Sequence, residues 1–84
     1  MKDDEKQYFI ELWSLRNDRR KFLDYNFSKS NSKRFMYILD KWDKKGFWNY
    51  GVSLRGGWFI ERNIPKRYLD LIEVKENGKQ EEDN

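Results

Sequence analysis

The side chains best suited to chemistry in this sequence are cations, and they gather in the middle of the chain. Between Arg16 and Arg67 there are 14 Lys and Arg residues against 5 Asp and Glu residues. The first fifteen residues carry 2 basic and 4 acidic side chains, and the fifteen from Asp70 onward carry 2 and 6. A basic centre between acidic ends is the charge pattern expected of a surface that binds phosphate groups.

The residue types that serve most catalysis at neutral pH are missing. The chain has no His and no Cys, which removes the usual general base and the commonest transition-metal ligands. Asp18, Asp24, Asp40 and Asp43 are mixed with Lys and Arg, and no motif sets two of them around a cleft. We therefore expect no enzyme, and no metal, cofactor or small-molecule substrate.

The composition is that of one small domain with an aromatic core. Its 84 residues include 4 Trp, 5 Tyr and 6 Phe, and each aromatic ring can bury roughly 150–250 Å². No apolar run approaches the length of a membrane span, and the start MKDDEK lacks the plan of a secretory signal. We expect a soluble cytoplasmic protein without a membrane partner.

Three helices are expected to hold the basic region. The first runs from about Asp4 to Arg16, and a short second helix runs from Asp18 to Tyr25. The serine-rich segment 28–32 predicts a turn, and a third helix follows from about Lys33 to the stop at Gly46. The apolar spacing of this third helix places four residues in the core: Phe35, Ile38, Leu39 and Trp42.

A β-hairpin and a last short helix complete the expected fold. Residues 47–50 and 58–60 are aromatic and β-branched, and the glycine-bracketed turn between them carries Arg55. Trp48 and Trp58 are both assigned to the core, with base stacking on single strands as the alternative. Pro65 predicts a helix start, with four residues on one face: Ile64, Tyr68, Leu71 and Ile72. Residues 1–74 form the predicted domain, and the acidic tail 75–84 is expected to be disordered.

The order of these elements resembles a winged helix-turn-helix domain. The stretch SKSNSKRFMYILDKWDKKGFWNYG is similar to the family's recognition helix, in which a serine-rich turn leads into a helix that ends before a glycine. The segment GVSLRGGWFI is loosely similar to the wing of the excisionase and MerR-like subgroup. The resemblance covers residues 18–60 and implies a small α+β fold of about three helices, a two-stranded β-hairpin wing and a short C-terminal helix.

The resemblance implies binding of double-stranded DNA by a transcriptional regulator or a recombination accessory factor. The third helix would enter the major groove and the hairpin would meet the backbone or minor groove. The residue chemistry suits phosphate contacts, base-edge reading and a minor-groove probe. The candidate residues in these roles are Lys29, Lys33, Lys41, Lys44 and Tyr37 for phosphates, Ser30, Asn31 and Arg34 for base edges, and Arg55 for the minor groove.

A protein-binding module is the alternative. A small charged domain without cofactor sites could be a regulator or inhibitor that docks on a larger protein, and exposed aromatics would favour that function. A homodimer is also compatible with the sequence, because one such domain would cover only a half-site. The composition, rich in Lys, Asn, Phe, Tyr and Ile and without Ala, is typical of an AT-rich coding sequence, so we expect a bacterial, phage or mobile-element origin.

Overall fold

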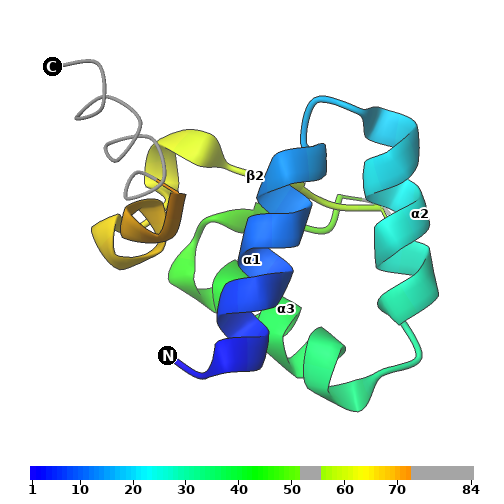
Figure 1. Ribbon diagram of the computed structural model, residues 1–84, viewed down its shortest axis with the longest axis horizontal. Helices are drawn as coiled ribbons and strands as arrows, with labels where there is room; N and C mark the ends of the chain where they lie inside the picture. Colours follow the sequence, from blue (N-terminus) through cyan, green and yellow to red (C-terminus); the bar gives the residue numbers. More distant parts are fainter. Residues whose placement is uncertain (52–55, 73–84) are drawn as a thin grey trace, which may run out of the picture.

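The computed structural model describes residues 1–51 and 56–72. The described part is a small α+β fold of helices with one two-stranded antiparallel hairpin, as the sequence predicts. In Figure 1, α1 lies between α2 and the helical turns at residues 66–72. The elements in chain order are α1 (Asp3–Leu15), α2 (Arg19–Lys29), α3 (Lys33–Lys45), β1 (Trp48–Asn49), β2 (Trp58–Phe59) and a 3-10 turn (Glu61–Asn63).

Helix α1 matches its predicted bounds within one residue at each end. Three carboxylates, from Asp3, Asp4 and Glu5, occupy its first turn, where negative charge favours the positive end of the helix dipole. Phe9 and Leu12 are fully buried. Helix α1 is joined to α2 by a 2.5 Å hydrogen bond that the Tyr25 hydroxyl donates to Glu11 Oε1.

Helix α2 is longer than the sequence predicted. Asp18 caps its start by accepting a hydrogen bond from the Lys21 backbone N–H at 3.1 Å. The predicted end at Tyr25 is wrong, because the helix continues to Lys29. Ser28 does not interrupt the helix, since its hydroxyl donates to the Tyr25 carbonyl three residues earlier, and Ser30 caps the helix end by donating to the Phe27 carbonyl.

Helix α3 begins and ends where the sequence predicts. The Ser32 hydroxyl caps its start by accepting from the Phe35 backbone N–H at 3.2 Å. Gly46 ends it with φ +90°, the left-handed conformation that glycine adopts without the steric cost of a side chain. The predicted buried face is confirmed, and it consists of Phe35, Ile38, Leu39 and Trp42.

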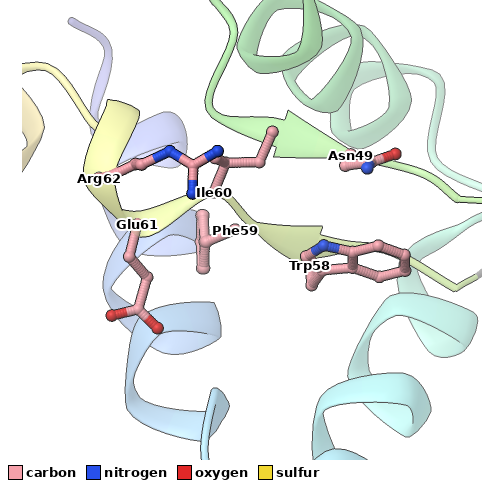
Figure 2. A pocket seen from close by; sticks show the side chains of 6 residues that line it. All are labelled: Asn49, Trp58, Phe59, Ile60, Glu61 and Arg62. Atoms are coloured by element: carbon pink, nitrogen blue, oxygen red, sulfur yellow. The ribbon is translucent and has the colours of Figure 1, made fainter.

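The hairpin confirms the predicted strands but places one tryptophan differently. In the antiparallel register Trp48 lies opposite Phe59, and Asn49 lies opposite Trp58. Side chains alternate between the faces of a strand, so Trp48 and Phe59 are buried while Asn49 and Trp58 share the outward face. Figure 2 shows Asn49 and Trp58 side by side on that face. The assignment of Trp58 to the core was wrong, because 43 % of it is exposed.

The segment after the hairpin returns to the core as predicted. Ile64, Tyr68 and Ile72 are buried, and the Pro65 carbonyl accepts backbone hydrogen bonds from Tyr68 and Leu69 at the helix start. The 3-10 turn at residues 61–63 was not predicted. The hairpin turn with Arg55 and the tail 75–84 lie outside the described residues.

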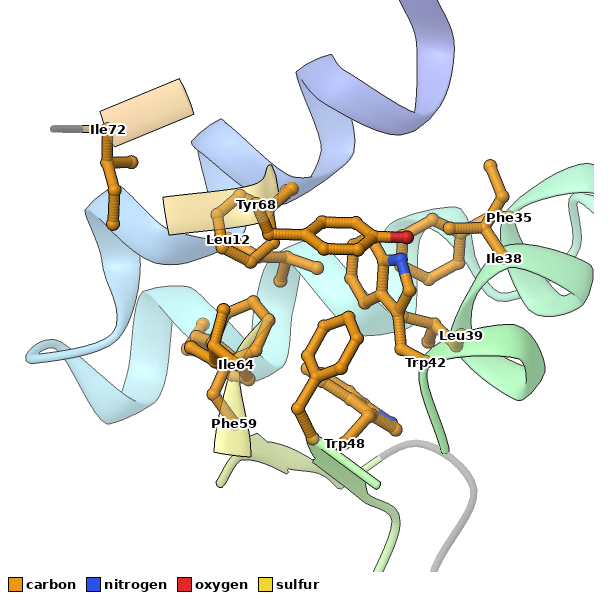
Figure 3. Packing of buried hydrophobic residues seen from close by; sticks show 13 residues of the cluster. Leu12, Phe35, Ile38, Leu39, Trp42, Trp48, Phe59, Ile64, Tyr68 and Ile72 are labelled. Atoms are coloured by element: carbon orange, nitrogen blue, oxygen red, sulfur yellow. The ribbon is translucent and has the colours of Figure 1, made fainter. Parts of the chain in front are cut away.

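Aromatic rings from the three helices, the hairpin and the C-terminal turns at residues 66–72 meet in one core. The Phe9 ring lies edge-on to Trp42 and Phe59, with centroids 5.8 Å and 5.3 Å away. The rings of Trp42 and Phe47 both approach Tyr68, and Figure 3 shows Trp42 and Tyr68 near the centre of the cluster. Edge-to-face pairs of this kind add stabilisation beyond the apolar area that they bury. The core therefore fixes α1, α3, the hairpin and the C-terminal turns relative to one another.

Candidate nucleic-acid interface

Helices α2 and α3 are joined by a turn of only three residues. Lys29 ends α2 and Lys33 begins α3, so residues 30–32 make the whole connection. Each end of the turn is fixed locally, by the Ser30 hydroxyl on the Phe27 carbonyl and by the Ser32 cap of α3. Two helices joined by a turn of three or four residues are the supersecondary unit of helix-turn-helix proteins.

The outward ridge of α3 carries exposed polar side chains. Lys33, Tyr37 and Lys44 are exposed, and Tyr37 is 61 % accessible. At 100° per residue these three lie within one narrow stripe, opposite the buried face. They are the predicted site residues that the structure brings together on one surface.

One carboxylate interrupts this ridge. Asp40 lies between Tyr37 and Lys44 on α3 and accepts a 2.5 Å hydrogen bond from the Tyr50 hydroxyl. Burial and this hydrogen bond raise the pKa of Tyr50, so the hydroxyl stays protonated. The hydrogen bond joins the hairpin segment to α3, and the Asp40 carboxylate lowers the net positive charge of the ridge.

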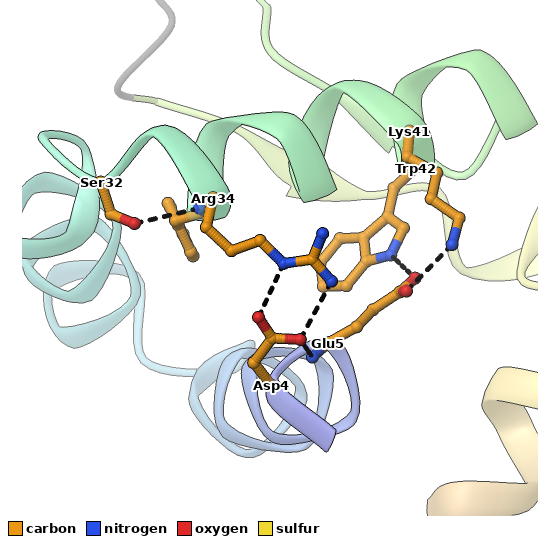
Figure 4. Close-up of polar contacts among 7 residues, drawn as sticks. Asp4, Glu5, Ser32, Arg34, Lys41 and Trp42 are labelled. Carbon is orange, nitrogen blue, oxygen red and sulfur yellow. Dashed lines mark hydrogen bonds and ion pairs between the residues drawn. The ribbon is translucent and has the colours of Figure 1, made fainter. Parts of the chain in front are cut away.

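Arg34 is directed toward α1 by an ion pair. Its Nε and Nη2 atoms lie 2.7 Å and 3.1 Å from the two carboxylate oxygens of Asp4. The hydrogen bond from Arg34 lowers the pKa of Asp4, and the same bond raises the pKa of Arg34. Figure 4 shows the two side chains bridging α1 and α3. Both remain more than a third exposed, so the pair is accessible to competing anions.

Lys41 also has a partner on α1. Its ammonium lies 3.0 Å from Glu5 Oε1, and its side chain is 38 % exposed while that of Glu5 is 2 % exposed. Arg34 and Lys41 therefore differ from Lys33 and Lys44, because each already neutralises a carboxylate of the same chain.

Glu5 is the buried polar centre of this region, and sequence reasoning placed it only at the helix dipole. Its Oε2 accepts hydrogen bonds from Trp42 Nε1 at 2.9 Å and from the Tyr68 hydroxyl at 2.5 Å. Burial opposes its ionisation, but the bonds from Tyr68, Trp42 and Lys41 outweigh that effect and lower its pKa. Its position four residues before the buried Phe9 was the signal that could have revealed it.

The remaining predicted residues lie around the turn between α2 and α3. The Lys29 ammonium sits 5.5 Å from the centre of the Tyr25 ring, and Asn31 is exposed at the middle of the turn. The Ser30 hydroxyl is occupied by its own helix. Arg55 lies outside the described residues.

The described residues show neither a metal-binding cluster nor a membrane-spanning helix. Residues 1–51 and 56–72 contain no group of three or more acidic, His or Cys side chains that could hold a metal ion. None of the helices described here has both the length and the apolar character that crossing a membrane requires.

No protein family, no curated protein and no solved structure matches the chain.

Proposed function

We propose that this chain binds double-stranded DNA as a winged helix-turn-helix domain. Helix α3 would lie in the major groove, and the β1–β2 hairpin would meet the backbone or minor groove. The observation that carries the proposal is the three-residue turn that leads into α3, together with the exposed stripe of Lys33, Tyr37 and Lys44 on that helix.

The order of elements supports the same assignment. Three helices precede an antiparallel hairpin, and α3 leads directly into β1 through Gly46 and Phe47. The buried face of α3 packs on the aromatic core, which leaves only its opposite face for a ligand. A helix held in this way can be inserted into a groove without losing its own packing.

The exposed residues divide between phosphate contact and base reading. Lys33 and Lys44 lie at opposite ends of α3, as suits a helix whose ends approach the two phosphate walls of a groove. Tyr37 lies between them and can donate to a phosphate or pack against a thymine methyl group. Asn31 at the turn has an amide that can pair with an adenine edge.

Arg34 and Lys41 have a different place in this proposal. Each must exchange an Asp4 or Glu5 carboxylate for a DNA phosphate before it adds to binding. That exchange gains less than a new contact, since one ion pair replaces another. The strongest contacts should therefore come from Lys33 and Lys44.

Binding to a random-sequence duplex tests the proposal. Fluorescence anisotropy of a labelled duplex should show binding at low salt, and the logarithm of the association constant should fall linearly with the logarithm of the salt concentration. Absence of duplex binding at low salt would reject the proposal.

A protein-binding function is the second candidate, and one observation favours it. Tyr37 is 61 % exposed and Trp58 is 43 % exposed, and aromatic side chains anchor protein interfaces. Under this alternative the affinity for duplex would be weak, and substituting Tyr37 or Trp58 would affect capture of a partner protein without affecting DNA binding.

A further inference from the structure

The outward face of the hairpin has features that binding by α3 does not use. Trp58 is exposed on this face, although a residue of its size is usually buried in so small a domain. Trp58 helps to line two surface hollows. One is lined by Asn49 and Arg62, the other by Arg16 and Arg19, and no residue of α3 lines either of them.

The Trp58 ring is held in place by the backbone around it. A Cβ added at Gly51 would lie 2.9 Å from ring atoms Cη2 and Cζ3, so the edge of the indole rests directly on that glycine. Its strand position opposite Asn49 fixes the other end. A flat aromatic surface is thereby presented at little cost in conformational entropy, as a stacking platform requires.

Arginine covers this ring only loosely. The Arg19 guanidinium carbon lies 5.7 Å from the Trp58 ring, while that of Arg16 stacks on Trp13 at 3.8 Å. Arg19 is also anchored, because it donates a hydrogen bond to the Gly57 carbonyl at 3.2 Å. Arg16 therefore covers the half-buried Trp13 ring in close contact. The Trp58 ring is more exposed, and Arg19 lies farther from it.

The charge around the ring is positive. Arg19 and Arg62 are exposed, and each lines a hollow that Trp58 also lines, while a single carboxylate, from Glu61, lines both hollows. Figure 2 shows the Glu61 and Arg62 side chains pointing to opposite sides of the 3-10 turn. An exposed aromatic ring with one guanidinium over it and a second lining the same hollow as the ring suits a base with its flanking phosphates.

We propose that the outward face of the hairpin is a second site, at which Trp58 stacks on an unpaired nucleobase while Arg19 and Arg62 contact the flanking phosphates. Paired bases cannot use this surface, because their faces are covered by their neighbours in the duplex. The ligand is therefore single-stranded nucleic acid, or an unpaired end or loop of a duplex. The site shares no residue with α3, so this proposal can be tested independently of the proposal that α3 binds duplex DNA.

Titration with a short oligothymidylate, about 10 nucleotides long, tests this proposal. Trp58→Ala should weaken binding roughly 5- to 100-fold, and Trp58→Phe should weaken it less because a stacking ring remains. Lys6→Ala, which removes a lysine from α1 away from both proposed sites, should leave the affinity for this oligonucleotide unchanged. Equal affinities for wild type and Trp58→Ala, or no binding by the wild type, would overturn the proposal and leave the exposed indole to a protein partner.

A second measurement needs no destabilising substitution. In ¹⁵N-labelled wild-type protein, the Trp58 indole N–H resonance is the one that disappears in Trp58→Phe. It should shift on addition of oligothymidylate, while the indole resonances of the buried Trp42 and Trp48 should stay in place. A Trp58 resonance that does not move, or that moves equally with a blunt duplex of the same affinity, would contradict stacking on an unpaired base.

Discussion

The indole N–H of Trp42 donates a 2.9 Å hydrogen bond to the buried carboxylate of Glu5, thirty-seven residues away in the chain. The same oxygen accepts from the Tyr68 hydroxyl, and the other oxygen pairs with Lys41. One side chain near the N-terminus therefore connects α1, α3 and the C-terminal turns. Removal of this carboxylate should destabilise the packing of α3 against α1 and the C-terminal turns.

Glu5→Ala should lower the free energy of unfolding by about 2–5 kcal/mol, since the Trp42 and Tyr68 donors would be left buried without an acceptor. Glu5→Gln should cost less, because its amide oxygen can still accept. Urea denaturation of the three proteins measures both effects. A loss below about 0.5 kcal/mol for Glu5→Ala would show that the carboxylate is not a structural centre.

The stability of the fold should depend on pH through Glu5. Its pKa is lowered in the folded state from the ordinary value of 4.5, so the folded protein binds fewer protons than the unfolded chain below that pH. The stabilisation is complete above about pH 4.5 and is lost as the pH falls through the lower, folded-state pKa. Urea denaturation at a series of pH values should show that the difference in unfolding free energy between wild type and Glu5→Gln becomes smaller below pH 4.5. A difference that is constant down to acid unfolding would contradict this assignment.

Asp4→Asn should strengthen duplex binding about two- to fivefold at low salt, because it releases Arg34 from its ion pair and removes a negative charge beside α3. Asp3→Asn is the matched control, with the same change in charge in the same helical turn. Anisotropy titrations compare the two. Equal gains would mean that only net charge matters and that Arg34 takes no part.

Gly57→Ala should destabilise the hairpin by about 1–3 kcal/mol through overpacking. A Cβ at this position would lie 2.5 Å from Cζ2 of Trp48, and Trp48 is almost fully buried, with 1 % of it exposed. In a Trp48→Phe background, which lacks the crowded ring atoms, Gly57→Ala should cause a smaller loss of unfolding free energy. A double-mutant cycle with no coupling between the two positions would show that the close contact is absent.

Local patterns in the sequence were sufficient to predict α1, α3 and the hairpin strands. The four-residue apolar stripe of α3, its Ser32 cap and its Gly46 stop all act within a few residues of one another, so they can be recognised without a structure. The end of α2 was missed because Ser28 and Ser30 have the composition of a turn but hydrogen-bond to carbonyls of the helix.

The candidate site was predicted less completely, because its polar contacts are long-range. Arg34 and Lys41 have the spacing of exposed residues on α3, and nothing in that spacing shows that they pair with Asp4 and Glu5. The outward position of Trp58 depends on strand register, which aromatic content alone does not reveal.

The salt dependence of duplex binding by α3 variants tests the central claim most directly. Lys33→Ala and Lys44→Ala should each reduce the slope of log association constant against log salt by roughly 0.9, the contribution of one phosphate contact. Lys6→Ala, which removes a lysine beside a surface hollow on α1, should leave the slope unchanged. Slopes for all three variants equal to that of the wild type would contradict DNA binding through the outward ridge of α3.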